Sequence, residues 1–137
     1  MKKLITLVAL VALAGCGGSS PTSPDSRNDI PNVGGTYSGA LVSSVNGRSF
    51  PITIQVTQAY TTVTFVVTFA GTNGQTQGTV DATGHVSFPR YSSASDPECG
   101  TMYYTEDYQF SGNSVTVSIL VETGWCGNTM LSGVLRK

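Results

Sequence analysis

Residues 50–69 read FPITIQVTQAYTTVTFVVTF, and their pattern indicates the fold class. From residue 50 to residue 58, apolar side chains alternate with Thr and Gln. Residues 62–69 repeat the alternation. Residues that alternate with a period of two lie on opposite faces of a β-strand. Each strand therefore has one apolar face for a core, formed by Phe50, Ile52, Ile54 and Val56 in the first and by Val63, Phe65, Val67 and Phe69 in the second.

Residues 114–121 show the same pattern, with Val115, Val117, Ile119 and Val121 on the apolar face. Weaker alternation predicts five more strands, at residues 36–42, 75–81, 85–89, 101–110 and 129–136. Turn signals separate most of these segments, at Asn46-Gly47, Asn73-Gly74, Thr83-Gly84, Gly112-Asn113 and Gly127-Asn128. Each pair supplies a residue that tolerates positive φ. The short links predict that sequential strands pair, and no helix is expected.

Eight short antiparallel strands in residues 34–137 must deal with their unpaired edges, and closing the sheet on itself removes them. The sequence therefore favours an all-β fold, an eight-stranded antiparallel up-and-down barrel. A two-sheet β-sandwich is the alternative. The outward positions carry Thr, Gln, Ser and Asp, where a barrel embedded in lipid needs an apolar band. We therefore expect a tethered domain outside the bilayer.

The N-terminus has the features of a signal peptide. Lys2 and Lys3 precede an apolar run at residues 4–13, which at about 1.5 Å per residue is too short to span a bilayer. Leu13-Ala14-Gly15-Cys16 resembles the lipobox of bacterial lipoproteins. The resemblance implies removal of residues 1–15, a diacylglyceryl group on the sulfur of Cys16 and fatty acylation of the new N-terminus. An ordinary secretory signal is the alternative.

Residues 16–33 would then form the lipidated cysteine and a flexible linker, because Gly, Ser, Pro, Asn and Asp dominate them. Gly17 stands where an Asp would favour the inner membrane, so we expect the outer membrane if the source is Gram-negative. The barrel domain follows at residues 34–137. Its opening Gly35-Thr36-Tyr37-Ser38-Gly39 and closing Leu131-Ser132-Gly133-Val134-Leu135 resemble small lipocalin-like or avidin-like barrels of the calycin type. The resemblance implies the architecture and transfers no ligand contact.

Three cysteines leave one without a partner if a disulfide forms, and lipidation of Cys16 accounts for it. Cys99 and Cys126 are then expected to form a disulfide in an oxidising compartment. The bridge would join the irregular stretch at residues 91–98 to the link between the last two strands. A metal site is the alternative, although two thiols and one distant His make a poor zinc set.

The charged residues point to no catalytic chemistry. Net charge is −1 and the basic residues are scattered, so nucleic acid is not an expected partner. His85 is the only histidine, and its neighbours Asp81 and Ser87 lack the arrangement of a catalytic triad. No calcium-loop spacing occurs among the carboxylates Asp96, Glu98, Glu106, Asp107 and Glu122. We expect no catalytic residue, no metal and no cofactor.

Aromatic residues are the more suggestive group. The candidate ligand contacts are Tyr91, Tyr103 and Trp125. Tyr91 and Trp125 belong to the expected rim loops at residues 91–99 and 123–128, and Tyr103 lies beside the first of them. The alternative is that the aromatic residues plug the barrel. Tyr104 and Tyr108 share the face of Phe110 and are expected in the core.

The first functional hypothesis is a non-enzymatic lipoprotein of the cell envelope that binds a small amphipathic ligand or a protein partner. The second is a structural lipoprotein with a filled barrel, and the third an envelope hydrolase.

Overall fold

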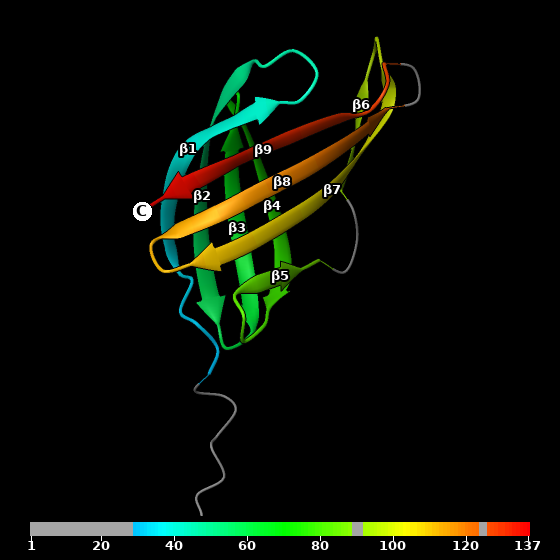
Figure 1. Ribbon diagram of the computed structural model, residues 1–137. Coiled ribbons are helices and arrows are strands. Elements are labelled where there is room, and N and C mark those ends of the chain that lie inside the picture. The colour runs from blue at the N-terminus through cyan, green and yellow to red at the C-terminus, as the bar shows by residue number, and fades with distance from the viewer. Residues whose placement is uncertain (1–28, 89–91, 124–125) are drawn as a thin grey trace, which may run out of the picture.

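A computed structural model describes residues 29–88, 92–123 and 126–137, and within these residues every regular element is a strand. Figure 1 labels nine strands: β1 (Gly35–Ser43), β2 (Ser49–Ala59), β3 (Thr62–Phe69), β4 (Thr72–Val80), β5 (His85–Ser87), β6 (Ser92–Asp96), β7 (Gly100–Ser111), β8 (Ser114–Thr123) and β9 (Thr129–Arg136). The described part of the chain contains no helix long and apolar enough to cross a membrane.

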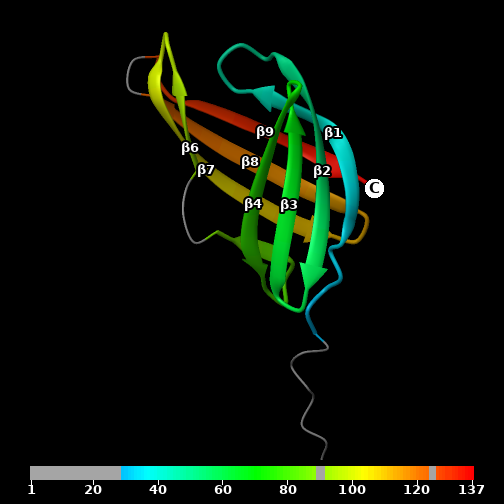
Figure 2. The same ribbon diagram turned by 180° about the vertical axis from the view of Figure 1, so that it is seen from behind.

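Eight of these strands close into an antiparallel barrel. Successive pairings run from β1 through β2, β3 and β4 to β5, and on the other side from β1 through β9 and β8 to β7. A further pairing between β5 and β7 completes the ring. Figures 1 and 2 show the two halves of the barrel curving around a common interior. The predicted up-and-down barrel is confirmed, and the sandwich alternative is wrong.

Strand β6 lies outside this ring and was not expected from the sequence. It pairs only with the first part of β7, from Ser92↔Tyr104 to Asp96↔Gly100. The prediction of an irregular stretch at residues 91–98 is therefore wrong for residues 92–96. The sequence of this segment, SSASD, has no apolar alternation that would predict a strand. It is a strand because its backbone pairs with β7.

Most predicted turns are found, because Gly47, Gly84, Gly112 and Gly127 all have positive φ between strands. The turn predicted at Asn73-Gly74 is wrong, since both residues lie within β4. The chain turns instead at Ala70-Gly71, where φ is 48° and 83°. Phe69 pairs with Thr72, so the loop has two residues, the length that favours positive φ at both positions.

One end of the barrel is filled by aromatic side chains. Phe65 lies 5.0 Å from Tyr108 and 6.3 Å from Phe110, measured between ring centroids, and Tyr37 lies 5.3 Å from Phe110. Tyr37, Phe65 and Tyr108 are fully buried. The expectation that Tyr108 belongs to the core is confirmed, and Tyr104 packs against that core.

The segment before β1 covers this filled end. Ile30 and Val33, which the sequence places in the linker, pack against the core. Val33 donates its backbone N–H to Gln58 Oε1 at 2.7 Å, and the Tyr37 hydroxyl donates to the carbonyl of Val33 at 3.0 Å. The N-terminal segment therefore leaves the barrel at the β2–β3 turn, at the bottom of Figures 1 and 2.

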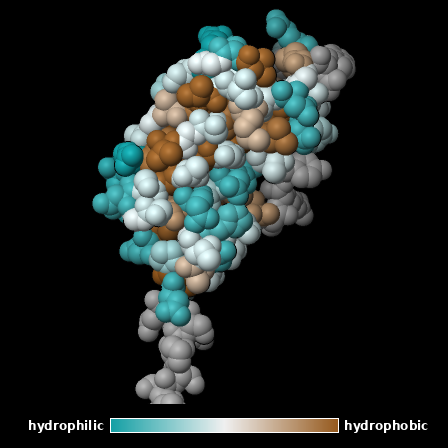
Figure 3. Space-filling view, in the orientation of Figure 1, coloured by the Kyte–Doolittle hydropathy of each residue, from teal (hydrophilic) through white to brown (hydrophobic). Residues whose placement is uncertain are grey.

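The outer surface is not uniformly polar. Figure 3 shows apolar patches among polar residues on the face where β8 and β9 lie in front. Val42, Met130 and Val134 are exposed apolar side chains of β1 and β9. The patches are interrupted by polar residues such as Ser132, which is paired with Val42.

Candidate functional site

The two ends of the barrel differ because the closing strand is short. β5 pairs with β4 only at Thr79↔Ser87 and Val80↔Val86, and with β7 only at His85↔Gln109 and Val86↔Tyr108. Residues 72–78 of β4 pair with β3 alone among the described residues. Among the described residues, strand pairing therefore closes the barrel beside the aromatic cluster and leaves β4 and β7 unpaired with each other at the other end, which we call the open end.

A cavity of about 420 Å³ occupies the open end. Its walls are mainly apolar and come from strands on both sides of the barrel. Its rim is polar where β4 begins, at Thr72, Asn73 and Gln75. The apolar and aromatic lining residues are Ile52, Val67, Phe69, Ala70, Tyr104, Ile119 and Leu131.

The space arises from the small residues that β4 turns inward. Val67 pairs with Gly74 and Phe65 with Thr76, so Gly74 and Thr76 share the inward face of their β3 partners. A Cβ atom placed on Gly74 would meet no atom within 4 Å. The larger residues Tyr104 and Glu106 of β7 also line the cavity.

Glu106 is the one charged side chain that lines the cavity among the described residues. It is half-buried on the inward face of β7, opposite Ile119 of β8. Burial raises the pKa of its carboxyl above the ordinary value. Within the described part of the chain it forms no hydrogen bond and no ion pair. Among the described residues, the Glu106 carboxyl therefore has no partner and faces mainly apolar walls.

Tyr108 is the next inward residue along β7 from Glu106. Its hydroxyl is buried and has no hydrogen-bond partner among the described residues. Burial, and secondly the charge of Glu106, raise the pKa of this phenol, so it stays protonated. An unsatisfied buried polar atom is uncommon in native structures and usually marks a functional or hydrated position.

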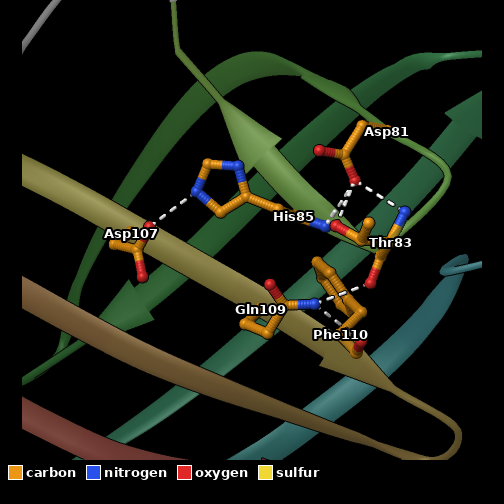
Figure 4. A network of polar contacts seen from close by, with 6 residues as sticks. All are labelled: Asp81, Thr83, His85, Asp107, Gln109 and Phe110. Atoms are coloured by element: carbon orange, nitrogen blue, oxygen red, sulfur yellow. Dashed lines mark hydrogen bonds and ion pairs between the residues drawn. The ribbon is translucent and has the colours of Figure 1, made fainter.

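His85 belongs to a different group of contacts, shown in Figure 4, on the outside of the closed end. Its Nε2 lies 2.7 Å from Asp107 Oδ1. Asp81 does not reach the imidazole: its Oδ1 accepts the Thr83 hydroxyl at 2.7 Å and the backbone N–H groups of Thr83 and His85. These hydrogen bonds, that of the Thr83 hydroxyl first, hold the pKa of Asp81 below its ordinary value.

This group of contacts holds the barrel closed. The amide of Gln109 donates to the carbonyl of Thr83 at 2.7 Å, and the backbone N–H of Phe110 donates to the carbonyl of Gly84 at 2.9 Å. A Cβ on Gly84 would lie 2.6 Å from the carbonyl oxygen of Phe110, so only glycine fits this approach. His85 and Asp81 therefore have a structural role, because their contacts help to attach the β4–β5 turn to β7.

The predicted disulfide is present between Cys99 and Cys126, with an S–S distance of 2.01 Å. It joins the turn between β6 and β7 to the link between β8 and β9, as expected. The chain-entropy model gives a bridge of this span about 3.6 kcal/mol of stabilisation. The described residues contain no cluster of three or more His, Cys, Asp or Glu side chains able to hold a metal ion.

Of the three candidate ligand contacts, the structure describes Tyr103 alone. Tyr91 and Trp125 lie outside the described residues, as does Cys16. Tyr103 is 43% exposed on the outer face of β7 and does not line the cavity, so its contact with a ligand stays a prediction. Its neighbour Tyr104 lines the cavity, and so does Glu106, which was named above only among the carboxylates that lack a calcium-loop spacing. Strand alternation could have predicted that Glu106 faces inward, because it lies two residues from Tyr104 and two from Tyr108 on the same strand.

Comparison of the chain with protein-family models, with curated proteins and with solved structures found no match.

Replacing Glu106 by Gln should stabilise the protein at neutral pH. Because the pKa of Glu106 is raised on folding, the folded state binds its proton more tightly, and stability falls as pH rises from the ordinary Glu value through the raised one. Glu106→Gln removes this fall. Urea unfolding from pH 4 to pH 8 measures it, with exposed Glu122→Gln as the matched control. Lower stability of Glu106→Gln than of the parent at pH 8 would contradict the account.

Proposed function

We propose that this protein is a non-enzymatic binding module of the bacterial cell envelope that takes a small amphipathic ligand into the open end of its barrel. The observation that carries the proposal is the cavity of about 420 Å³, with apolar walls and a single charged group among its described lining residues. Small-molecule sites typically measure about 300–1,000 Å³ and combine apolar walls with a few polar groups. The cavity lies within this range.

The position of the N-terminal segment supports an anchored receptor. The cavity reaches the β3–β4 turn, at Phe69 and Ala70, whereas the segment before β1 is fixed beside Gln58 at the other end of β3. The two ends are also opposite in Figures 1 and 2. A lipid on Cys16 would therefore leave the cavity facing away from the membrane and open to its ligand.

Export and lipidation rest on the N-terminal sequence. The signal peptide at residues 1–15 and the lipobox that ends in Cys16 support a lipid-anchored envelope protein, on the outer membrane if the source is Gram-negative. The Cys99–Cys126 disulfide agrees with an oxidising compartment. Two or three acyl chains would hold such a small domain stably on a membrane.

A second candidate is a structural envelope lipoprotein whose barrel needs no ligand. The aromatic cluster that fills the closed end favours it, because this half of the barrel is packed like a core. The two candidates differ in what they expect of the open end. A structural barrel would bind no small amphiphile there, whereas a binding module would bind one saturably.

A variant that narrows the cavity tests the proposed function. The parent should bind 1-octanol saturably, with dissociation constants in the millimolar range or tighter and NMR shifts at Val67, Phe69 and Ile119. Gly74→Leu should weaken binding by about tenfold or more, since its side chain enters open space. Gln77→Leu, on the outer face of the same strand, is the control. Absence of saturable binding to the folded parent would overturn the proposal.

A separate experiment tests the anchor. Full-length protein expressed in a Gram-negative bacterium should appear in the membrane fraction, with an intact mass that exceeds residues 16–137 by a diacylglyceryl and an acyl group. Cys16→Ser should abolish both the added mass and the membrane association, because the acyl chains supply the apolar burial. A parent protein of unmodified mass, soluble after export, would refute lipidation.

A further inference from the structure

The carboxylate of Glu106 limits which amphiphiles the cavity can accept. Its described wall neighbours, Ile52, Val67, Phe69, Ile119 and Leu131, offer no hydrogen-bond donor from their side chains. The polar lining residues of β4 are neutral Thr, Asn and Gln. Placing a carboxylate against apolar walls costs free energy unless a partner compensates it. The described part of the chain supplies no such partner.

Two of the cations that the structure describes lie over aromatic rings that do not line the cavity. The guanidinium of Arg48 lies 5.7 Å from the ring centroid of Phe50, and the ammonium of Lys137 lies 5.2 Å from that of Tyr37. Tyr37 belongs to the closed end of the barrel, away from Glu106. Burial raises the pKa of the Glu106 carboxyl, and no cation among the described residues forms an ion pair with it.

Tyr104 adds a second group suited to a cation. It lines the cavity two residues before Glu106 on the same face of β7. The face of a tyrosine ring attracts ammonium groups, most strongly where water is excluded. A carboxylate and an aromatic ring on one wall, with aliphatic side chains on the others, suit a molecule that has one cationic group and one apolar body.

We propose that the cavity selects cationic amphiphiles, with an amine or quaternary ammonium group against Glu106 and Tyr104 and the apolar body among Val67, Phe69 and Ile119. This inference rests on the proposed function and names the ligand class for the same site. At about 30 Å³ for each group of the size of water, the cavity holds on the order of a dozen heavy atoms. The ligand is therefore a short-chain or single-ring amine.

A neutral or anionic amphiphile of the same length would bind less well. The neutral one leaves Glu106 without a counter-charge, and the anionic one places two negative charges together in a poorly hydrated space. The order of affinity expected for a common octyl chain is therefore ammonium first, then alcohol, then carboxylate. Selectivity for charge, rather than affinity alone, is the property to measure.

The experiment compares octyltrimethylammonium, 1-octanol and octanoate by calorimetry and by NMR on the folded protein at pH 7.5. The ammonium compound should bind about tenfold or more tightly than the alcohol, and octanoate most weakly. Glu106→Gln should remove the preference for ammonium and leave octanol binding within about twofold. Glu122→Gln, which removes the same charge from the exposed face of β8, should retain the preference.

The outcomes separate this inference from the proposed function. If octanol binds in the cavity but ammonium has no advantage, the inference is wrong while the proposed function stands. If Glu106→Gln keeps the full advantage, the cationic group binds elsewhere and the inference is overturned. If none of the three compounds binds, the proposed function itself fails. Unchanged NMR spectra outside the cavity verify that each variant is folded.

Discussion

The short strand β5 is the constraint on which the arrangement of this barrel depends. Three residues join β4 to β7, and the contacts around Gly84 and Gln109 fasten that junction from the outside. Because β5 is so short, β4 pairs with it only at Thr79 and Val80, whereas the rest of β4 pairs with β3 alone among the described residues. A longer β5 would extend the closure along the gap beside the cavity. The open end follows from the length of one strand.

The closed end provides the stability that the open end lacks. Aromatic rings packed at 5–6 Å fill the interior beside β5, and such burial is the main favourable contribution to folding. The open end has two features that lower stability, an apolar cavity and the half-buried carboxyl group of Glu106. The Cys99–Cys126 bridge constrains the strand ends on this side. The cavity thus lies above an interior that buried aromatic side chains fill.

The sequence predicted the barrel because alternation in β2, β3 and β8 is strict, and it predicted the disulfide because the cysteine count left one pair. It failed where tertiary pairing decides. β6 has no apolar pattern and forms only because it pairs with β7. The turn predicted at Asn73-Gly74 lies instead at Ala70-Gly71, where it keeps Phe69 facing inward. The cavity depends on where β5 ends, which no local pattern marks. Glu106 was detectable, since strand alternation places it between two inward tyrosines.

Amide hydrogen exchange of the described domain, followed residue by residue by NMR, tests whether β5 closes only one end of the barrel. Alternate amides at residues 72–77 should exchange as fast as those of exposed loops, because they face the gap, whereas amides near Val80, Val86 and Phe110 should be strongly protected. Uniform strong protection along residues 72–77 would mean that another strand seals the barrel there, and it would contradict the account.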